Sequence, residues 1–253
     1  MTAMEHTIID APRGRAVPFP GFPPEALAFL RSLKRNNRRE WFQPRKHIYD
    51  DHVRAPMAAL VEALDAAMMK FAPAYVREPD AAIYRIYRDT RFSADKTPYK
   101  PYVAAIFPRR GLDKHACAGL YFSVSAEGIE IAGGVYMPTP EELRAIRLYL
   151  LDHHEEFRRI LRARALRSLM GELQGDKLAR VPKGFDAAHP AVGLVRAKQW
   201  LLDVQLDSAL AATPKLYTEI VQRFRAMAPF VEFLNAPLVA ARPRRGVVAE
   251  PRP

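Results

Sequence analysis

The stretch GLYFSVSAEGIEIAGGVYMPTPEE, residues 119–142, decides the fold class of this chain. Residues 119–125 and 128–136 are short runs rich in Tyr, Ile, Val and Phe, which favour β-strands. Residues 126–128, Ala-Glu-Gly, make a tight turn between them, so the two runs are predicted to form a hairpin. Residues 139–142, Thr-Pro-Glu-Glu, then combine a capping residue, a proline at the first helical position and an acidic side chain at the third, which predicts a helix start.

Two further runs upstream have the same strand-like composition. Residues 82–88 and 99–107 are short, and the links between successive runs are short as well. Sequential strands with short links favour an antiparallel meander, here of about four or more strands. Within 82–88, the alternation of a strand would place Ala82, Tyr84 and Ile86 on the core face.

Helical patterns occupy the chain before this region. Residues 22–35 begin at Pro23-Pro24 and repeat leucine at helical spacing. A second helical pattern runs to Met68, where Asn37 followed by Glu40 resembles a capping arrangement. Pro44 and Pro56 are predicted to kink or divide this second helix.

Helical patterns return after residue 139. The first is expected to break near Asp152, a shorter helix is expected near 191–202, and the last begins at Thr213-Pro214. Gly133-Gly134 would let a ligand or another stretch of backbone approach closely, but we favour a β-bulge within the preceding strand. The fold class predicted is α+β, an antiparallel β-meander with N-terminal and C-terminal helices packed on it.

One domain, residues 21–235, accounts for these patterns, since no repeat or linker interrupts them. Residues 1–20 are interpreted as a flexible N-terminal arm and residues 236–253 as a disordered tail rich in Arg and Pro. A single cysteine makes an intrachain disulfide impossible and favours a reducing, cytoplasmic location. No signal-like or membrane-spanning run is evident, so no membrane partner is expected.

The densest polar chemistry lies in YRIYRDTRFSADKTPYKPY, residues 84–102. Guanidinium and ammonium groups bind carboxylate or phosphate, so the expected anion-binding residues are Arg85, Arg88, Arg91 and Lys96. The carboxyl and phenol groups here supply candidate acid–base or proton-donating residues, namely Asp89, Asp95 and Tyr99. A loop that leaves a scaffold strand is a usual place for such a site.

Three functional hypotheses remain open for this segment. The first is an enzyme acting on a phosphate- or carboxylate-bearing substrate, with an anionic small molecule as its partner. The second is a non-catalytic module that binds nucleic acid or an acidic protein. A net charge of +11 can indicate such a partner, but we discount it here, because arginines outnumber lysines 29 to 10, as a GC-rich coding sequence would give regardless of function. The third is a structural network of ion pairs. Common nucleotide-binding and zinc-protease motifs are missing, no metal site is predicted, and the patterns specify no cofactor or oligomeric state.

At the same residues the chain resembles an uncharacterised, mostly bacterial family with the motif R-x-x-R-D-x-R-F-x-x-x-[DN]-K-x-x-Y. The matching residues, with two rather than three positions between Phe92 and Asp95, are Arg85, Arg88, Asp89, Arg91, Phe92, Asp95, Lys96 and Tyr99. The resemblance extends over roughly 21–235 and includes Trp41-Phe42 and residues 182–185. It implies that the motif matters to the family, and it implies no reaction.

Overall fold

A four-stranded antiparallel sheet forms the centre of the computed structural model, which describes residues 18–91, 93–114 and 116–241. The strands follow the chain in the order β1-β2-β3-β4. Their bounds are Tyr102–Pro108 for β1, Gly119–Ser125 for β2, Ile129–Val135 for β3 and Trp200–Leu206 for β4. The predicted α+β meander is therefore confirmed.

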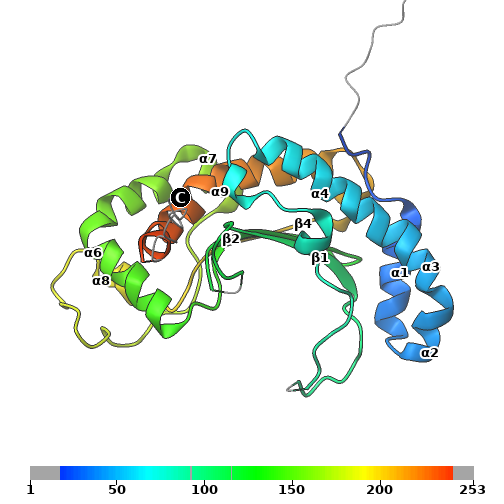
Figure 1. The fold of residues 1–253 in the computed structure, drawn as a ribbon, viewed down its shortest axis with the longest axis horizontal. Helices are drawn as coiled ribbons and strands as arrows, with labels where there is room; N and C mark the ends of the chain where they lie inside the picture. The colour runs from blue at the N-terminus through cyan, green and yellow to red at the C-terminus, as the bar shows by residue number, and fades with distance from the viewer. Residues whose placement is uncertain (1–17, 92, 115, 242–253) are drawn as a thin grey trace, which may run out of the picture.

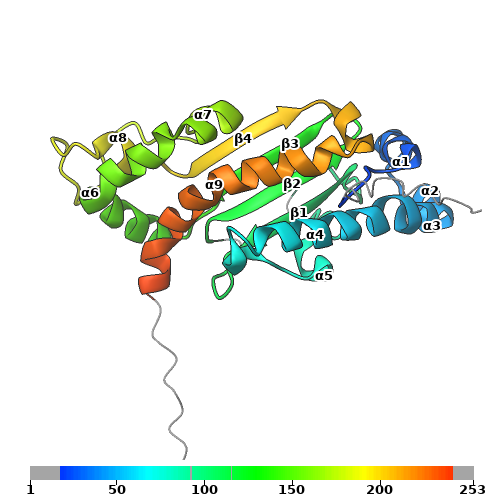
Figure 2. The same ribbon diagram turned by 90° about the horizontal axis from the view of Figure 1, so that it is seen from above.

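Helices cover one face of this sheet and leave the other face open (Figures 1 and 2). Helix α9, Lys215–Ala240, crosses the covered face beside α4, Ala55–Met68. The helices α1, Pro24–Arg35, α2, Arg39–Phe42, and α3, Lys46–Tyr49, stand at one end of the molecule. At the other end lie α6, Pro140–Arg162, α7, Arg164–Met170, and α8, Val192–Val195.

The main core lies between the sheet and α9. Alternation along the strands sends every second side chain toward the helices, so Phe122 and Leu202 are fully buried. The side of α9 that faces the sheet is equally buried, and it consists of the stripe expected from helical spacing: Leu216, Ile220, Phe224, Met227, Val231 and Leu234. This packing fixes which strand residues face the open side.

Most predicted helix boundaries agree with the observed ones, and local side-chain chemistry explains why. The second helical run is divided, as expected. A 3₁₀ turn at Gln43–Arg45, which contains Pro44, separates α2 from α3, and a π-helical turn at Asp50–Arg54, just before Pro56, separates α3 from α4. At the start of α6, the Thr139 hydroxyl accepts from the Glu142 amide and the Glu142 carboxylate accepts from the Thr139 amide, which completes a capping box. The expected break falls at His153, whose backbone leaves helical geometry.

The strand predicted over residues 82–88 is wrong. Pro79–Ala82 forms the short helix α5, and the chain then runs extended with isolated bridges from Ile83 to Ala105 and from Tyr87 to Tyr99. Pro98 and Pro101 lie opposite this segment and lack an amide hydrogen, so a continuous ladder cannot form there. Ala82 and Ile86 are buried as expected, whereas Tyr84 is only half-buried.

The fourth strand comes instead from the segment interpreted as a helix near 191–202. Only Val192–Val195 is helical, and Trp200–Leu206 is β4. Its sequence alternates, with Trp200 and Leu202 buried on the helix-covered face and Leu201 and Asp203 on the open face. Buried residues at every second position are typical of a strand, and this alternation was the evidence in the sequence against a helix.

Gly133 and Gly134 do not form a bulge. The pairing of β3 with β4 runs through both residues without interruption. Gly134 has a φ of +130°, and a Cβ there would lie 2.0 Å from the carbonyl oxygen of Trp200. Glycine is therefore required by the close approach of the neighbouring strand.

The ends of the domain lie beyond the predicted boundaries. Phe19, assigned to the arm, is buried and packs edge-on against Phe22. Helix α9 continues through Pro237 to Ala240, so the first residues of the expected tail are helical, and Leu238 is buried. The rest of the expected arm, residues 1–17, and of the expected tail, residues 242–253, lie outside the described part of the chain.

Candidate functional site: a pocket on the open face of the sheet

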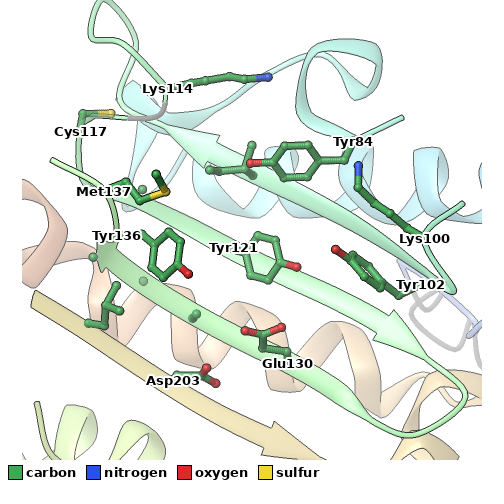
Figure 3. Close-up of a pocket in the computed structure, with 16 residues that line it drawn as sticks. Tyr84, Lys100, Tyr102, Lys114, Cys117, Tyr121, Glu130, Tyr136, Met137 and Asp203 are labelled. Carbon is green, nitrogen blue, oxygen red and sulfur yellow. The ribbon is translucent and has the colours of Figure 1, made fainter. Parts of the chain in front are cut away.

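A cavity of about 610 Å³ lies on the open face of the sheet, and we call it the sheet pocket (Figure 3). Side chains from all four strands form its floor, because alternate residues point away from α9. The segment before β1 and the β1–β2 loop form one wall. Its polar and aromatic lining residues are Tyr84, Lys100, Tyr102, Lys114, Tyr121, Glu130, Tyr136 and Asp203.

Two lysines form the cationic wall of the sheet pocket. The Lys100 ammonium lies 5.3 Å from the centre of the Tyr84 ring, and the Lys114 ammonium lies 5.4 Å from it. An aromatic face stabilises a nearby cation, so this ring holds both charges at the pocket edge. In Figure 3 the two side chains flank Tyr84.

Lys100 lies half-buried in this wall beside other cations. Its ammonium donates a hydrogen bond of 2.8 Å to the carbonyl oxygen of Arg85. Burial lowers its pKa, and the positive charges of Arg85, Arg88 and Lys114 lower it further. Four cationic groups therefore repel one another around one rim, and a bound anion would relieve that repulsion.

A pair of carboxyl groups occupies the opposite side of the sheet pocket. Glu130 on β3 and Asp203 on β4 are diagonal neighbours, because Ala132 is the residue directly opposite Asp203. Burial raises the pKa of both carboxyls, and the Asp203 charge raises that of Glu130 further. Ser123 Oγ donates to Glu130 Oε2 at 3.3 Å. Neither carboxyl forms an ion pair within the part of the chain that the structure describes.

A second, smaller cavity connects this pocket to the motif found in the sequence. It has a volume of about 340 Å³, and its lining includes Arg88 and Asp89. It shares Lys100 and Tyr102 with the sheet pocket. The motif therefore reaches the site through only some of its residues.

Within the loop of residues 88–101, most charged groups bind one another. The Arg88 guanidinium donates to the Asp95 carboxylate and to the Thr97 hydroxyl. The Arg88 hydrogen bond and the Thr97 amide lower the pKa of Asp95 to about 2. Because Arg88 already donates hydrogen bonds to two side chains of the loop, only its remaining N–H groups can bind an external anion.

Asp89 and Arg91 form a second pair at the surface. Arg91 donates to both carboxylate oxygens, with distances of 3.0 Å from Nε to Oδ1 and 2.7 Å from Nη2 to Oδ2. These bonds and the Arg91 amide lower the pKa of Asp89 to about 2, so this group is ionised at neutral pH and is a poor proton donor. Lys96 donates to the carbonyl oxygen of Thr90 at 2.8 Å.

The last two predicted site residues lie apart from these pairs. Arg85 is exposed, and its side chain makes no hydrogen bond or ion pair with a described residue. Tyr99 is 2% exposed and stacks on Phe42 with ring centres 4.2 Å apart. Its amide and carbonyl bind the Asn37 side chain at 3.0 and 2.8 Å, so Asn37 serves this loop and not the predicted helix cap. The structure places Tyr99 in the core and away from solvent.

Sequence reasoning missed the groups on the strands and in the β1–β2 loop. Lys114, Tyr121, Glu130 and Asp203 are separated along the chain and form no motif. A signal was present in β2 and β3, where polar residues alternate with buried apolar ones on the face opposite the core. Asp203 could not be placed because its segment was interpreted partly as a helix.

Within residues 18–91, 93–114 and 116–241, no group of three His, Cys, Asp or Glu side chains could hold a metal ion. In the same ranges, no helix has both the length and the apolar character needed to cross a bilayer.

Comparison with known proteins gives the family of the chain. The model of a family described as a conserved hypothetical protein matches residues 25–233, which covers the sheet, the helices on it and both cavities. No curated protein matches the chain. The chain therefore belongs to the conserved hypothetical protein family DUF2461.

Proposed function

We propose that the sheet pocket binds a small organic anion, with a carboxylate or phosphate group against Lys100 and Lys114 and an apolar or aromatic body over the tyrosines of the floor. The observation that carries this proposal is the position of Lys100. It is half-buried on the pocket wall among three other cations, with a backbone carbonyl as its hydrogen-bond acceptor.

The lining supports a ligand of mixed character. Tyr84, Tyr102, Tyr121 and Tyr136 offer aromatic faces and hydroxyl groups, and Ile106 and Leu201 add apolar surface. Pockets for small molecules are commonly largely apolar with a few convergent polar groups. Arg85 and Arg88 lie close enough to Lys100 to lower its pKa, so they extend the same positive region.

The proposed anion site lies in the sheet pocket and not at the ion pairs of the loop. Asp89 with Arg91, and Asp95 with Arg88, satisfy one another and hold the loop in shape. In the proposed site, Arg88 and Arg85 lie at the rim and add positive charge near Lys100. Arg91 and Lys96 belong to the scaffold of the loop.

A ligand titration tests the proposal. We expect benzoate or phenyl phosphate, at constant ionic strength, to raise the melting temperature of the wild type. At 100 times the dissociation constant the stabilisation is about 2.7 kcal/mol, or roughly 5–10 °C for a domain of this size. Benzyl alcohol lacks the charge, and inorganic phosphate lacks the apolar body, so both should have smaller effects.

Two lysine variants make the titration specific. Lys100→Met removes one charge from the pocket wall, and Lys215→Met removes one charge from the exposed start of α9 on the covered side of the sheet. Lys100→Met is expected to abolish the shift, and Lys215→Met to preserve it. Equal shifts in both variants, for every anion tried, would show a general salt effect and refute the proposal.

A further inference from the structure

The carboxyl pair of the sheet pocket has a property that anion binding alone does not require. Asp203 Oδ1 is shielded from solvent and accepts no hydrogen bond from a described residue. The ionisable side chain that acts on it is the Glu130 carboxyl, which is also an acceptor when ionised. Two ionised carboxylates in this position would repel each other in a poorly solvated place.

Among the residues that the structure describes, no cation acts on the charge of this pair. The titratable groups that face Glu130 are Tyr102 on β1, Tyr121 on β2 and Asp203 on β4. Ser123, between them, donates its hydroxyl proton to Glu130. The lysines lie at the other side of the pocket in Figure 3, and neither makes an ion pair with the two acids.

We propose that Glu130 and Asp203 share one proton and form the acid–base pair of the sheet pocket. The shared proton makes a hydrogen bond between the two carboxyl groups, which supplies the missing donor to Asp203. In this state the pair carries one negative charge. It can give its proton to a basic atom of a bound molecule, and it can take a proton from an acidic one, with no other reactant needed.

This inference deepens the proposed function, since the pair would act on the molecule that the lysine wall binds. It narrows the class of chemistry to proton transfer on an organic anion. It also gives different duties to the two sides of the pocket: the lysines hold the charge of the ligand, and the carboxyls exchange its proton.

Infrared spectroscopy of the ligand-free protein tests the shared proton directly. Asp65 has a pKa of about 6 and would contribute a similar band, so every protein compared carries Asp65→Asn. In this background we expect the carbonyl stretch of a protonated carboxyl group at pH 6–7. Glu130→Gln removes one acid, and Asp203→Asn removes the charge that keeps Glu130 protonated, so each should abolish that band. Glu127→Gln makes the same substitution in the exposed turn of the hairpin and should keep it. A band that survives in both pocket variants, or that is lost in only one, overturns the inference.

The pH dependence of benzoate binding tests the link between the pair and the ligand. When the pair loses its shared proton, its charge falls from −1 to −2, and a benzoate on the lysine wall should bind about two- to tenfold more weakly. Glu130→Gln should remove this step, and Glu127→Gln should retain it. A wild-type affinity that does not fall as the infrared band disappears would overturn the link.

The infrared band and the binding of benzoate test the acid–base pair and the proposed function independently of each other. If the band is present and no anion binds, the shared proton stands and the proposed function fails. If benzoate binds and the band is missing, the binding site stands and the acid–base pair fails.

Discussion

At the residue scale, burial and hydrogen bonding move the carboxyl groups of this chain in opposite directions. Asp89 and Asp95 lie at the surface and receive guanidinium donors, so their pKa values fall to about 2. Asp65 on α4 lies partly buried beside Glu78, and burial raises its pKa to about 6. The motif aspartates are thus fixed as anions, whereas burial raises the pKa of Asp65, Glu130 and Asp203.

The raised pKa of Asp65 predicts a stability change with pH. Its ordinary pKa is 3.8, so its contribution is fully present below about pH 4 and is lost as pH rises through about 6. Asp65→Asn keeps an oxygen for the Arg77 amide, which Asp65 Oδ1 accepts at 3.3 Å. We expect the variant to gain about 1–2 kcal/mol relative to the wild type between pH 4 and pH 7, allowing for partial solvation.

Urea melts of both proteins across that range measure this gain. The gain should grow with pH and level off above about pH 7. A difference that stays constant from pH 4 to pH 7 would show that Asp65 does not titrate in the window.

At the element scale, Asn37 joins two parts of the fold. It lies between α1 and α2, and it binds both the amide and the carbonyl of Tyr99, just before β1. Asn37→Ala would leave both backbone groups of a buried residue without partners, which should cost about 2–3 kcal/mol. Asn36→Ala is the matched control, because Asn36 donates only to Ser32 within its own helix end.

Chemical denaturation distinguishes the two asparagines. The control should cost less than about 1 kcal/mol. Equal losses in the two variants would mean that the link to Tyr99 adds nothing beyond local helix capping.

The elements also show what the sequence can and cannot predict. Helix starts at Pro24, Pro140 and Lys215 were predictable, because prolines and caps act within a few residues. The hairpin of β2 and β3 was predictable from its turn, in which Ser125 Oγ accepts from the amides of Glu127 and Gly128. The edge segment near 82–88 was not, since strand pairing depends on a distant partner whose prolines interrupt the ladder.

The candidate site was predictable only at its rim, for the same reason. Arg88 and Lys100 fall in a conspicuous local cluster, whereas Glu130 and Asp203 meet through the pairing of β3 with β4. A local charge cluster also draws attention to ion pairs that satisfy themselves, as Asp89 and Arg91 do.

At the scale of the whole molecule, the two faces of the sheet have different roles. The helix-covered face forms the core that stabilises the fold, and the open face forms the proposed binding pocket. The core against α9 contains the large apolar side chains, and the open face contains the tyrosines, lysines and carboxyls. A change on the open face can therefore alter the pocket with little loss of packing, which is why the lysine and carboxyl variants are useful probes. The second hypothesis from the sequence, binding of nucleic acid or an acidic protein, stays a prediction.

The late position of β4 in the chain has a consequence for folding kinetics. β1, β2 and β3 are joined by short loops, whereas residues 136–199 must be ordered or looped out before β4 can pair with β3. Closing a long loop is slow relative to forming a hairpin, so β4 is expected to dock after the rate-limiting barrier. Leu202→Ala on β4 should then speed unfolding and leave the refolding rate nearly unchanged, whereas Phe122→Leu on β2 should slow refolding.

Stopped-flow refolding and unfolding rates for these two variants measure the order of assembly. Slower refolding of Leu202→Ala would place β4 docking before the barrier and contradict it. If β4 does dock last, Glu130 and Asp203 come together only in the final step, and a nascent chain has no complete pocket until residue 206 and α9 behind it have been synthesised.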